Sequence, residues 1–238
     1  MSYTKDKQFI SKMFDEISPS YDRMNHLMSC GQDLRWRKLA VKYIQTLNGK
    51  YEHILDLAAG SGDFGREFLK LKPVKMFSAD ISPGMLKINR EKVNHKVNNP
   101  IITDAEKLPF RDNYIDLCGI AFGIRNFENL ERCIQEINRV LKPGGYLFVI
   151  EMFKPHRNNL FDKSFKLYFN KFVPLVGKLM SRSKYAYNYL HYSVENFLTV
   201  DSFINLAEEI GFNVIFRQKN FSDIVYSVCF KKKIMNSL

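Results

Sequence analysis

Apolar and polar positions follow a regular order between residues 53 and 151. Short apolar runs of strand length lie at 53–57, 74–79, 101–102, 114–122 and 146–150. Between them, apolar residues recur at helical spacing over 63–71, 83–97 and 128–142. Ser82 before Pro83 is a typical helix start, and Pro143, Gly144 and Gly145 predict a sharp turn. This alternation predicts a mostly parallel sheet covered by helices on both faces.

The segments on either side of this core have other patterns. Amphipathic helices are expected at 5–17, which Ser18-Pro19-Ser20 ends, and at 33–47. After Glu151 an aromatic and basic stretch, helical in pattern, breaks the alternation. A helix at 199–210 and two strands, 213–217 and 225–231, then follow, and we expect the two strands to form a closing antiparallel pair.

The prediction is therefore one α/β domain with a doubly wound, mostly parallel, seven-stranded sheet. An N-terminal helical cap (1–48) precedes the alternating α/β core (52–151). A helical lid insertion (152–195) follows the core, and a closing helix and strand pair (196–233) completes the domain.

Composition narrows the class of protein. The chain has 238 residues, of which 45% are hydrophobic and 26% charged, and this excludes wholesale disorder. No run of 18 residues lacks charge, and the start MSYTKDKQF is polar, so we expect neither a membrane-spanning helix nor a secretory signal. The four cysteines and five histidines show no metal-ligand spacing, so a reducing cytoplasm and no metal are expected. The cysteines are Cys30, Cys118, Cys133 and Cys229.

The charge is unevenly distributed. The chain holds 36 Lys and Arg against 25 Asp and Glu, for a net charge of +11. Residues 152–192 hold eight of the basic residues against Asp162 alone. Such a surface favours nucleic acid, acidic lipid or an anionic substrate as a partner, and simple lysine enrichment is the alternative.

A glycine-rich loop is the first candidate site. Residues 60–65, GSGDFG, fit G-x-G-x-x-G after a strand and at the start of a helix, and Asp80 follows 20 residues later. A tight turn with an N-cap aspartate is the structural alternative. Asp56 and Asp63 would repel the phosphates of a dinucleotide, whereas S-adenosylmethionine is cationic. Asp104 after the third strand, with Ala105, would lie beside the adenine.

Several motifs then add a family resemblance over nearly the whole chain. LDLAAGSGDFG, ADISPGML, TDAEKLPF, FGIRN and RVLKPGG resemble class I S-adenosylmethionine-dependent methyltransferases, and more narrowly the quinone C-methyltransferase family. That family's signature Y-D-x-M-N-x-x-[LIVN]-S-x-x-x-H-x-x-W matches Tyr21 to Trp36, with Met28 at an aliphatic position and Asp33 where the family has histidine.

The resemblance implies an enzyme that methylates a ring carbon of a polyprenyl quinol. Demethylmenaquinol is favoured over a ubiquinone precursor because the shorter N-terminus and Trp36-Arg37-Lys38 are closer to that branch. The expected cofactor contacts are Asp56, Gly60, Ser61, Gly62, Asp80, Asp104, Ala105 and the backbone of Ala121.

Carbon methylation also needs groups for the quinol oxygen. Arg125 and Asn126 follow the fourth strand, where a cation could stabilise a phenolate or hold a water and an amide could orient a ring oxygen. A surface salt bridge is the alternative for Arg125. Tyr21 and Asp22 either close over the cofactor or simply cap a helix, and Glu151 is either a structural acid or a substrate contact.

Other classes remain as alternatives: a methyltransferase for another small molecule, an RNA-modifying or RNA-binding protein, and a nicotinamide oxidoreductase. AFGIRN after the fourth strand lacks the paired prolines of base-amine methylation, and no RNA-binding module is visible. We therefore expect no nucleic-acid partner.

The basic insertion has an amphipathic pattern. On a helical wheel Phe161, Phe165, Tyr168, Phe169 and Phe172 share one side, while Lys163 and Lys166 lie on the other. This is typical of an interfacial membrane segment, and a lid helix with a solvated basic face is the alternative. The prediction is reversible attachment to an anionic membrane through 153–185.

Overall fold

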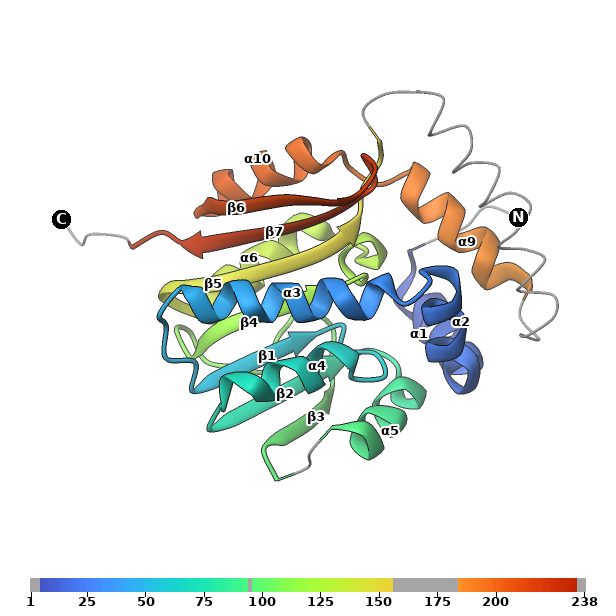
Figure 1. Cartoon of the computed structure of the whole chain (residues 1–238), viewed down its shortest axis with the longest axis horizontal. Helices are drawn as coiled ribbons and strands as arrows, with labels where there is room; N and C mark the ends of the chain where they lie inside the picture. The colour runs from blue at the N-terminus through green and yellow to red at the C-terminus, as the bar shows by residue number, and fades with distance from the viewer. Residues whose placement is uncertain (1–4, 94–95, 156–183, 235–238) are drawn as a thin grey trace.

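A seven-stranded sheet forms the centre of the part of the chain that the structure describes. The structure is a computed structural model that describes residues 5–93, 96–155 and 184–234 (Figure 1). The strands are β1 (His53–Leu57), β2 (Lys75–Asp80), β3 (Asn98–Ile102), β4 (Ile115–Ala121), β5 (Leu141–Met152), β6 (Phe212–Phe221) and β7 (Val225–Lys232). Their order is β3-β2-β1-β4-β5-β7-β6. β1 to β5 are parallel, while β7 is antiparallel to both β5 and β6. The predicted fold class is confirmed.

Helices cover both faces of this sheet. The α-helices are α1 (Lys7–Ile17), α2 (Tyr21–Met28), α3 (Gln32–Thr46), α4 (Asp63–Phe68), α5 (Pro83–Lys92), α6 (Leu130–Val140), α9 (Lys184–Glu195) and α10 (Val200–Ile210). Short 3₁₀ helices are η1 (Ser18–Ser20), η2 (Leu69–Leu71) and η3 (Ile124–Asn126). α3 and α4 lie against one face, and α6 and α10 lie against the other (Figure 1).

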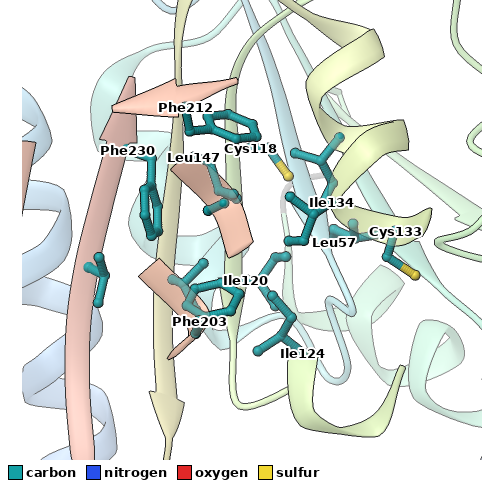
Figure 2. Close-up of a cluster of buried hydrophobic side chains, with 14 of the residues drawn as sticks. Leu57, Cys118, Ile120, Ile124, Cys133, Ile134, Leu147, Phe203, Phe212 and Phe230 are labelled. Carbon is teal, nitrogen blue, oxygen red and sulfur yellow. The ribbon is translucent and has the colours of Figure 1, made fainter. Parts of the chain in front are cut away.

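The period of two along each strand divides the core between these faces. Leu55 and Leu57 of β1 join the cluster under α6 and α10, while Ile54 joins the cluster under α3 and α4. Figure 2 shows part of the first cluster, where Phe203 and Ile134 pack against the strands. The same alternation decides which face each polar strand residue meets.

α1 ends at Ile17, as predicted, but a helix that was not predicted, α2, begins at Tyr21 directly after Ser18–Ser20. Pro19 lies in the first turn of η1, where its missing N–H costs nothing, and the chain continues as helix. Met24 is the fully buried residue of α2, so the helix lacks the apolar stripe that would have indicated it.

The Pro-Gly-Gly turn is part of a strand. β5 begins at Leu141, directly after α6 ends at Val140. Leu141 pairs with Ile115 and Tyr146 with Leu117, so the residues between them form a bulge, in which Gly144 has a φ of +73°. The Pro-Gly-Gly sequence, which is typical of a turn, therefore lies in a bulge of β5 and does not reverse the chain.

The helices α1, α2 and α9 gather at the carboxyl ends of the parallel strands (Figure 1). Of the predicted lid at 152–195, the structure describes residues 152–155 and α9, and the predicted amphipathic helix at 161–172 lies outside the described residues. Within the described ranges, no helix combines the length and apolar character needed to span a bilayer.

Candidate active site

A cavity opens at the carboxyl ends of β1 to β4. Its empty space, counted with the open mouth, is about 740 Å³, a size that suits a cofactor with part of a substrate. It is lined by Lys5, Lys7, Ile10, Phe14 and Tyr21 from the N-terminal segment. The loops after the strands contribute Gly60, Asp80, Asp104, Ala105, Ala121 and Asn126, among others. Most of the predicted cofactor contacts therefore meet in one place.

Gly60 and Asp80 form the centre of the cavity wall. The Gly60 N–H donates to Asp80 Oδ2 at 2.8 Å, and the Ser82 N–H donates to Asp80 Oδ1 at 2.8 Å. Burial raises the pKa of Asp80 above its ordinary value. Each carboxylate oxygen keeps a lone pair, so Asp80 can still accept two hydroxyl groups of a ribose.

The rest of the glycine loop lies outside the cavity lining. At Gly62, φ is +96°, and a Cβ there would come within 2.6 Å of Val93. The Ser61 hydroxyl donates to Asp22. Lys92 Nζ lies 2.7 Å from Asp22 Oδ2 and 2.6 Å from an oxygen of Asp63. Ser61, Gly62 and Asp22 therefore hold the loop against α2 and α5, and the Lys92 ammonium already neutralises the acidic pair.

Asp56 is a correction to the sequence-based site. Its side chain is 1% exposed and does not line the cavity. It faces the Gly65 N–H under α4, because the alternation of β1 directs position 56 to that face. Burial raises the pKa of Asp56 well above its ordinary value, and the side chain is not part of the cavity lining that a ligand would meet.

One end of the cavity is held by charge pairs between α1 and the loop after β3. Lys7 Nζ lies 2.7 Å from Asp104 Oδ2, 3.0 Å from Glu106 Oε1 and 3.7 Å from Glu128 Oε2. Ala105 and Cys133 line the same region. The N-terminal helix thus closes over the position predicted for the adenine.

A buried ion pair adjoins Asn126 in the chain, although neither of its members is part of the cavity lining. Arg125 Nη1 donates to Glu151 Oε1 and to the Phe122 carbonyl oxygen, each at 2.7 Å. Arg125 Nε donates to Ser193 Oγ at 3.3 Å. Glu151 is completely buried and Arg125 is 7% exposed, so the alternative of a surface salt bridge is wrong. Glu151 is the counter-ion of Arg125.

Asn126 lies beside this pair and lines the cavity. Its side-chain oxygen is buried and has no hydrogen-bond partner among the described residues. A buried acceptor of this kind is unfavourable unless a ligand supplies the donor. Tyr21 also lines the cavity, and burial raises the pKa of its hydroxyl, so that group stays protonated at neutral pH.

Sequence reasoning missed Lys5, Lys7 and Phe14. Their amphipathic helix was expected, but no local pattern indicates that its N-terminal end docks on loops that follow β3 and β4. A charged residue just before a helix was the available signal, and it is too common to identify a site.

Comparison with known proteins identifies the class. The model of the ubiE/COQ5 methyltransferase family matches residues 1–231. A demethylmenaquinone methyltransferase of Chlorobaculum parvum is 39% identical over 212 residues, which cover 88% of this chain and 86% of the relative. A ubiquinone/menaquinone biosynthesis C-methyltransferase UbiE of Stutzerimonas stutzeri is 37% identical over 211 residues, which cover 86% of this chain and 81% of the relative.

Solved structures agree on the fold. The solved structure of a SAM-dependent methyltransferase, possible histamine N-methyltransferase, of Thermotoga maritima superposes with a TM-score of 0.62 at 18% identity. The match covers 94% of this chain and 99% of the other. The fold and the cavity are those of a class I S-adenosylmethionine-dependent methyltransferase. The chain belongs to the ubiE/COQ5 methyltransferase family, which confirms the predicted family, enzyme class and cofactor.

The residues present fit S-adenosylmethionine. The groups that line the cavity include Asp80 and Asp104, and such carboxylates suit a cationic cofactor better than a pyrophosphate. Asp80 would hold the ribose, and Ala105 with Phe127 would contact the adenine. The orphaned oxygen of Asn126 indicates a further ligand group beside them.

Proposed function

We propose that the protein transfers the methyl group of S-adenosylmethionine to a ring carbon of demethylmenaquinol, which gives menaquinol. The names of the relatives support this substrate class. The observation that carries the proposal is the orphaned amide oxygen of Asn126 in the cavity lining, next in the chain to the fixed cation of Arg125.

The cofactor supplies an electrophilic methyl group when it is bound. Asp80, Asp104 and Ala105 position it by holding its ribose and adenine, and the Ala121 backbone would contact it from the end of β4. Ser61, Gly62 and Asp22 keep the loop after β1 in shape. Orientation of this kind supplies much of the rate of a displacement reaction.

Arg125 and Asn126 act on the substrate. The Asn126 oxygen accepts the hydrogen of a quinol hydroxyl and so orients the ring. The Arg125 Nη2, which has no hydrogen-bond partner in the described part of the chain, donates to a ring oxygen or to the water that accepts the proton. Glu151 keeps the guanidinium in place. Tyr21 stays protonated and serves as a donor rather than as a base.

A methyl-transfer assay tests the proposal. Purified protein is incubated with labelled S-adenosylmethionine and reduced demethylmenaquinone, and the label is counted in the lipid extract. Asn126→Leu is expected to reduce the label strongly and leave S-adenosylhomocysteine binding intact. Asn129→Leu is the matched control, because Asn129 caps α6 and does not line the cavity. No label from the wild-type protein would refute the proposal.

The second candidate is C-methylation in ubiquinone synthesis, which the Stutzerimonas stutzeri relative favours by its name. A benzoquinol precursor in the same assay distinguishes the two. Greater transfer to the benzoquinol than to demethylmenaquinol would reverse the order of the candidates.

A peripheral contact with the cytoplasmic face of an anionic membrane belongs to this proposal, because a polyprenyl quinol lives in the bilayer. It rests on the sequence of 153–185, most of which lies outside the described residues. Each lysine near an anionic surface contributes about 1 kcal/mol. Sedimentation with anionic vesicles at low and high salt, comparing wild type with Lys163→Glu/Lys166→Glu, tests the contact. Equal pelleting of both proteins would exclude it.

A further inference from the structure

Lys5 lines the cavity but forms no ion pair with a carboxylate in the described part of the chain. Its Nζ lies 5.5 Å from the centroid of the Phe197 ring. Lys7, only two residues later, contacts three carboxylates. The two lysines of this segment thus have opposite surroundings, and within the described ranges Lys5 is the one without a carboxylate counter-ion.

The surroundings of Lys5 are also cationic. Burial lowers the pKa of Lys5, the Arg125 charge lowers it further, and the Glu151 charge raises it in part. Glu151 already accepts two hydrogen bonds from Arg125. Among the described residues no carboxylate pairs with Lys5, so a bound anion would supply its counter-ion.

The position of Lys5 decides which anion this is. The charged amino-acid end of the cofactor is expected at the loop after β1, beside Gly60. The Nζ of Lys5 lies instead over the Phe197 ring, in the segment that follows α9. An aromatic ring with a negatively charged oxygen fits a site that combines an apolar aromatic surface with a cation.

We infer that Lys5 binds the anionic oxygen of the aromatic substrate and is a substrate-binding residue of the N-terminal segment. The inference rests on the proposed function, because it takes a quinol as the substrate. It adds that docking of the N-terminal segment completes the substrate site.

A pair of ring compounds tests this without methyl transfer. 2-Hydroxy-1,4-naphthoquinone is an anion at neutral pH, and 2-methyl-1,4-naphthoquinone is its neutral counterpart. Binding of each to the full-length protein, saturated with S-adenosylhomocysteine, is measured by calorimetry. Lys5→Met is expected to weaken binding of the anion about tenfold and to leave the neutral ring unchanged, since a hydrogen bond to a charged group is worth about 1.5–3 kcal/mol and Lys5 is half-exposed.

Controls separate the possible outcomes. Lys5→Arg should restore most of the affinity for the anion. Lys12→Met removes an exposed lysine of α1 away from the cavity and should change nothing. The inference is overturned if Lys12→Met matches Lys5→Met, if both ring compounds weaken equally, or if Lys5→Met weakens S-adenosylhomocysteine binding instead. That last result would assign Lys5 to the cofactor carboxylate.

The methyl-transfer assay keeps this inference apart from the proposed function. Lys5→Met should raise the KM for the reduced quinone more than it lowers kcat. Wild-type protein that transfers no methyl group refutes the proposed function and leaves the anion-binding result standing. Wild-type and Lys5→Met proteins with equal KM values refute the role of Lys5 alone.

Discussion

The charge pairs at the two ends of the site, Lys7–Asp104 in the cavity lining and Arg125–Glu151 outside it, are held in different ways. Beside β3, the side chains of Lys7 and Asp104 are each 34% exposed, so water screens their attraction. Beside β4, Arg125 and Glu151 are 8% and 0% exposed, and breaking their pair would leave a charge in the protein interior. The first end can open at little cost and suits the passage of a ligand. The second end is rigid and suits the orientation of a reacting ring.

The largest effect is expected where the buried pair is broken. Glu151→Gln leaves the Arg125 charge without a counter-ion and should lower the free energy of unfolding by about 3 kcal/mol in urea denaturation. The double variant Arg125→Met/Glu151→Leu should regain most of that stability without regaining methyl transfer. A loss below about 1 kcal/mol in Glu151→Gln would show that this end behaves like an exposed bridge.

Between the two ends, Asp80 is expected to act on the ligand. Asp80→Asn replaces one carboxylate oxygen by an NH₂ group, which then faces the backbone N–H of Gly60 or Ser82 instead of accepting its hydrogen bond. The substitution also removes the negative charge that would hold the ribose. The affinity for S-adenosylhomocysteine, measured by calorimetry, should fall about 10- to 100-fold. Asp112→Asn, on an exposed aspartate outside the cavity lining, is the control. Similar losses in both variants would contradict the role of Asp80.

Asp56 sharpens the comparison, because it is buried like Glu151 but has no ion pair within the described ranges. Its folded-state pKa lies well above the ordinary 3.8, so the folded protein holds a proton that the unfolded chain releases. Stability therefore falls as pH rises above that ordinary value. Asp56→Asn should stabilise by about 1 kcal/mol near neutral pH, or roughly 2–4 °C in Tm, and less near pH ~4. A Tm gain that is the same at both pH values would argue against a protonated Asp56.

The smallest effect is expected at the open end. Lys7→Ala should change the free energy of unfolding by less than about 1 kcal/mol, and the change should diminish at high salt. Thermal melts at two salt concentrations measure this. A loss as large as that of Glu151→Gln, or one that salt does not alter, would remove the distinction between the two ends.

Much of the fold follows from local patterns. Strand positions in the core were predictable because buried parallel strands are apolar and are followed by turn residues. β1, which ends at Leu57, and β2, which ends at Asp80, are examples. α2 was missed because eight mostly polar residues are helical through context. The bulge in β5 was read as a turn, because Gly144 supplies the same positive φ in either structure.

Most of the candidate site was predictable because its residues end or follow a strand. Asp80 ends β2, Asp104 and Ala105 follow β3, and Asn126 follows β4 in η3, and the carboxyl ends of these strands share one edge of the sheet. Glu151 could not be assigned, because its partner Arg125 lies 26 residues earlier in the chain. Lys5 was not predictable either, because its neighbour Phe197 is distant in sequence and is brought to it by tertiary packing.

The antiparallel insertion of β7 between β5 and β6 has a consequence for folding during synthesis. Until residues 225–232 have left the ribosome, β5 has a neighbour on one side only, and a hydrophobic strand offers its open edge to other chains. Met152 pairs with Val225, so this contact closes a long loop and forms late. The nascent chain is therefore most exposed to aggregation and to chaperones after the whole parallel half of the sheet has been made.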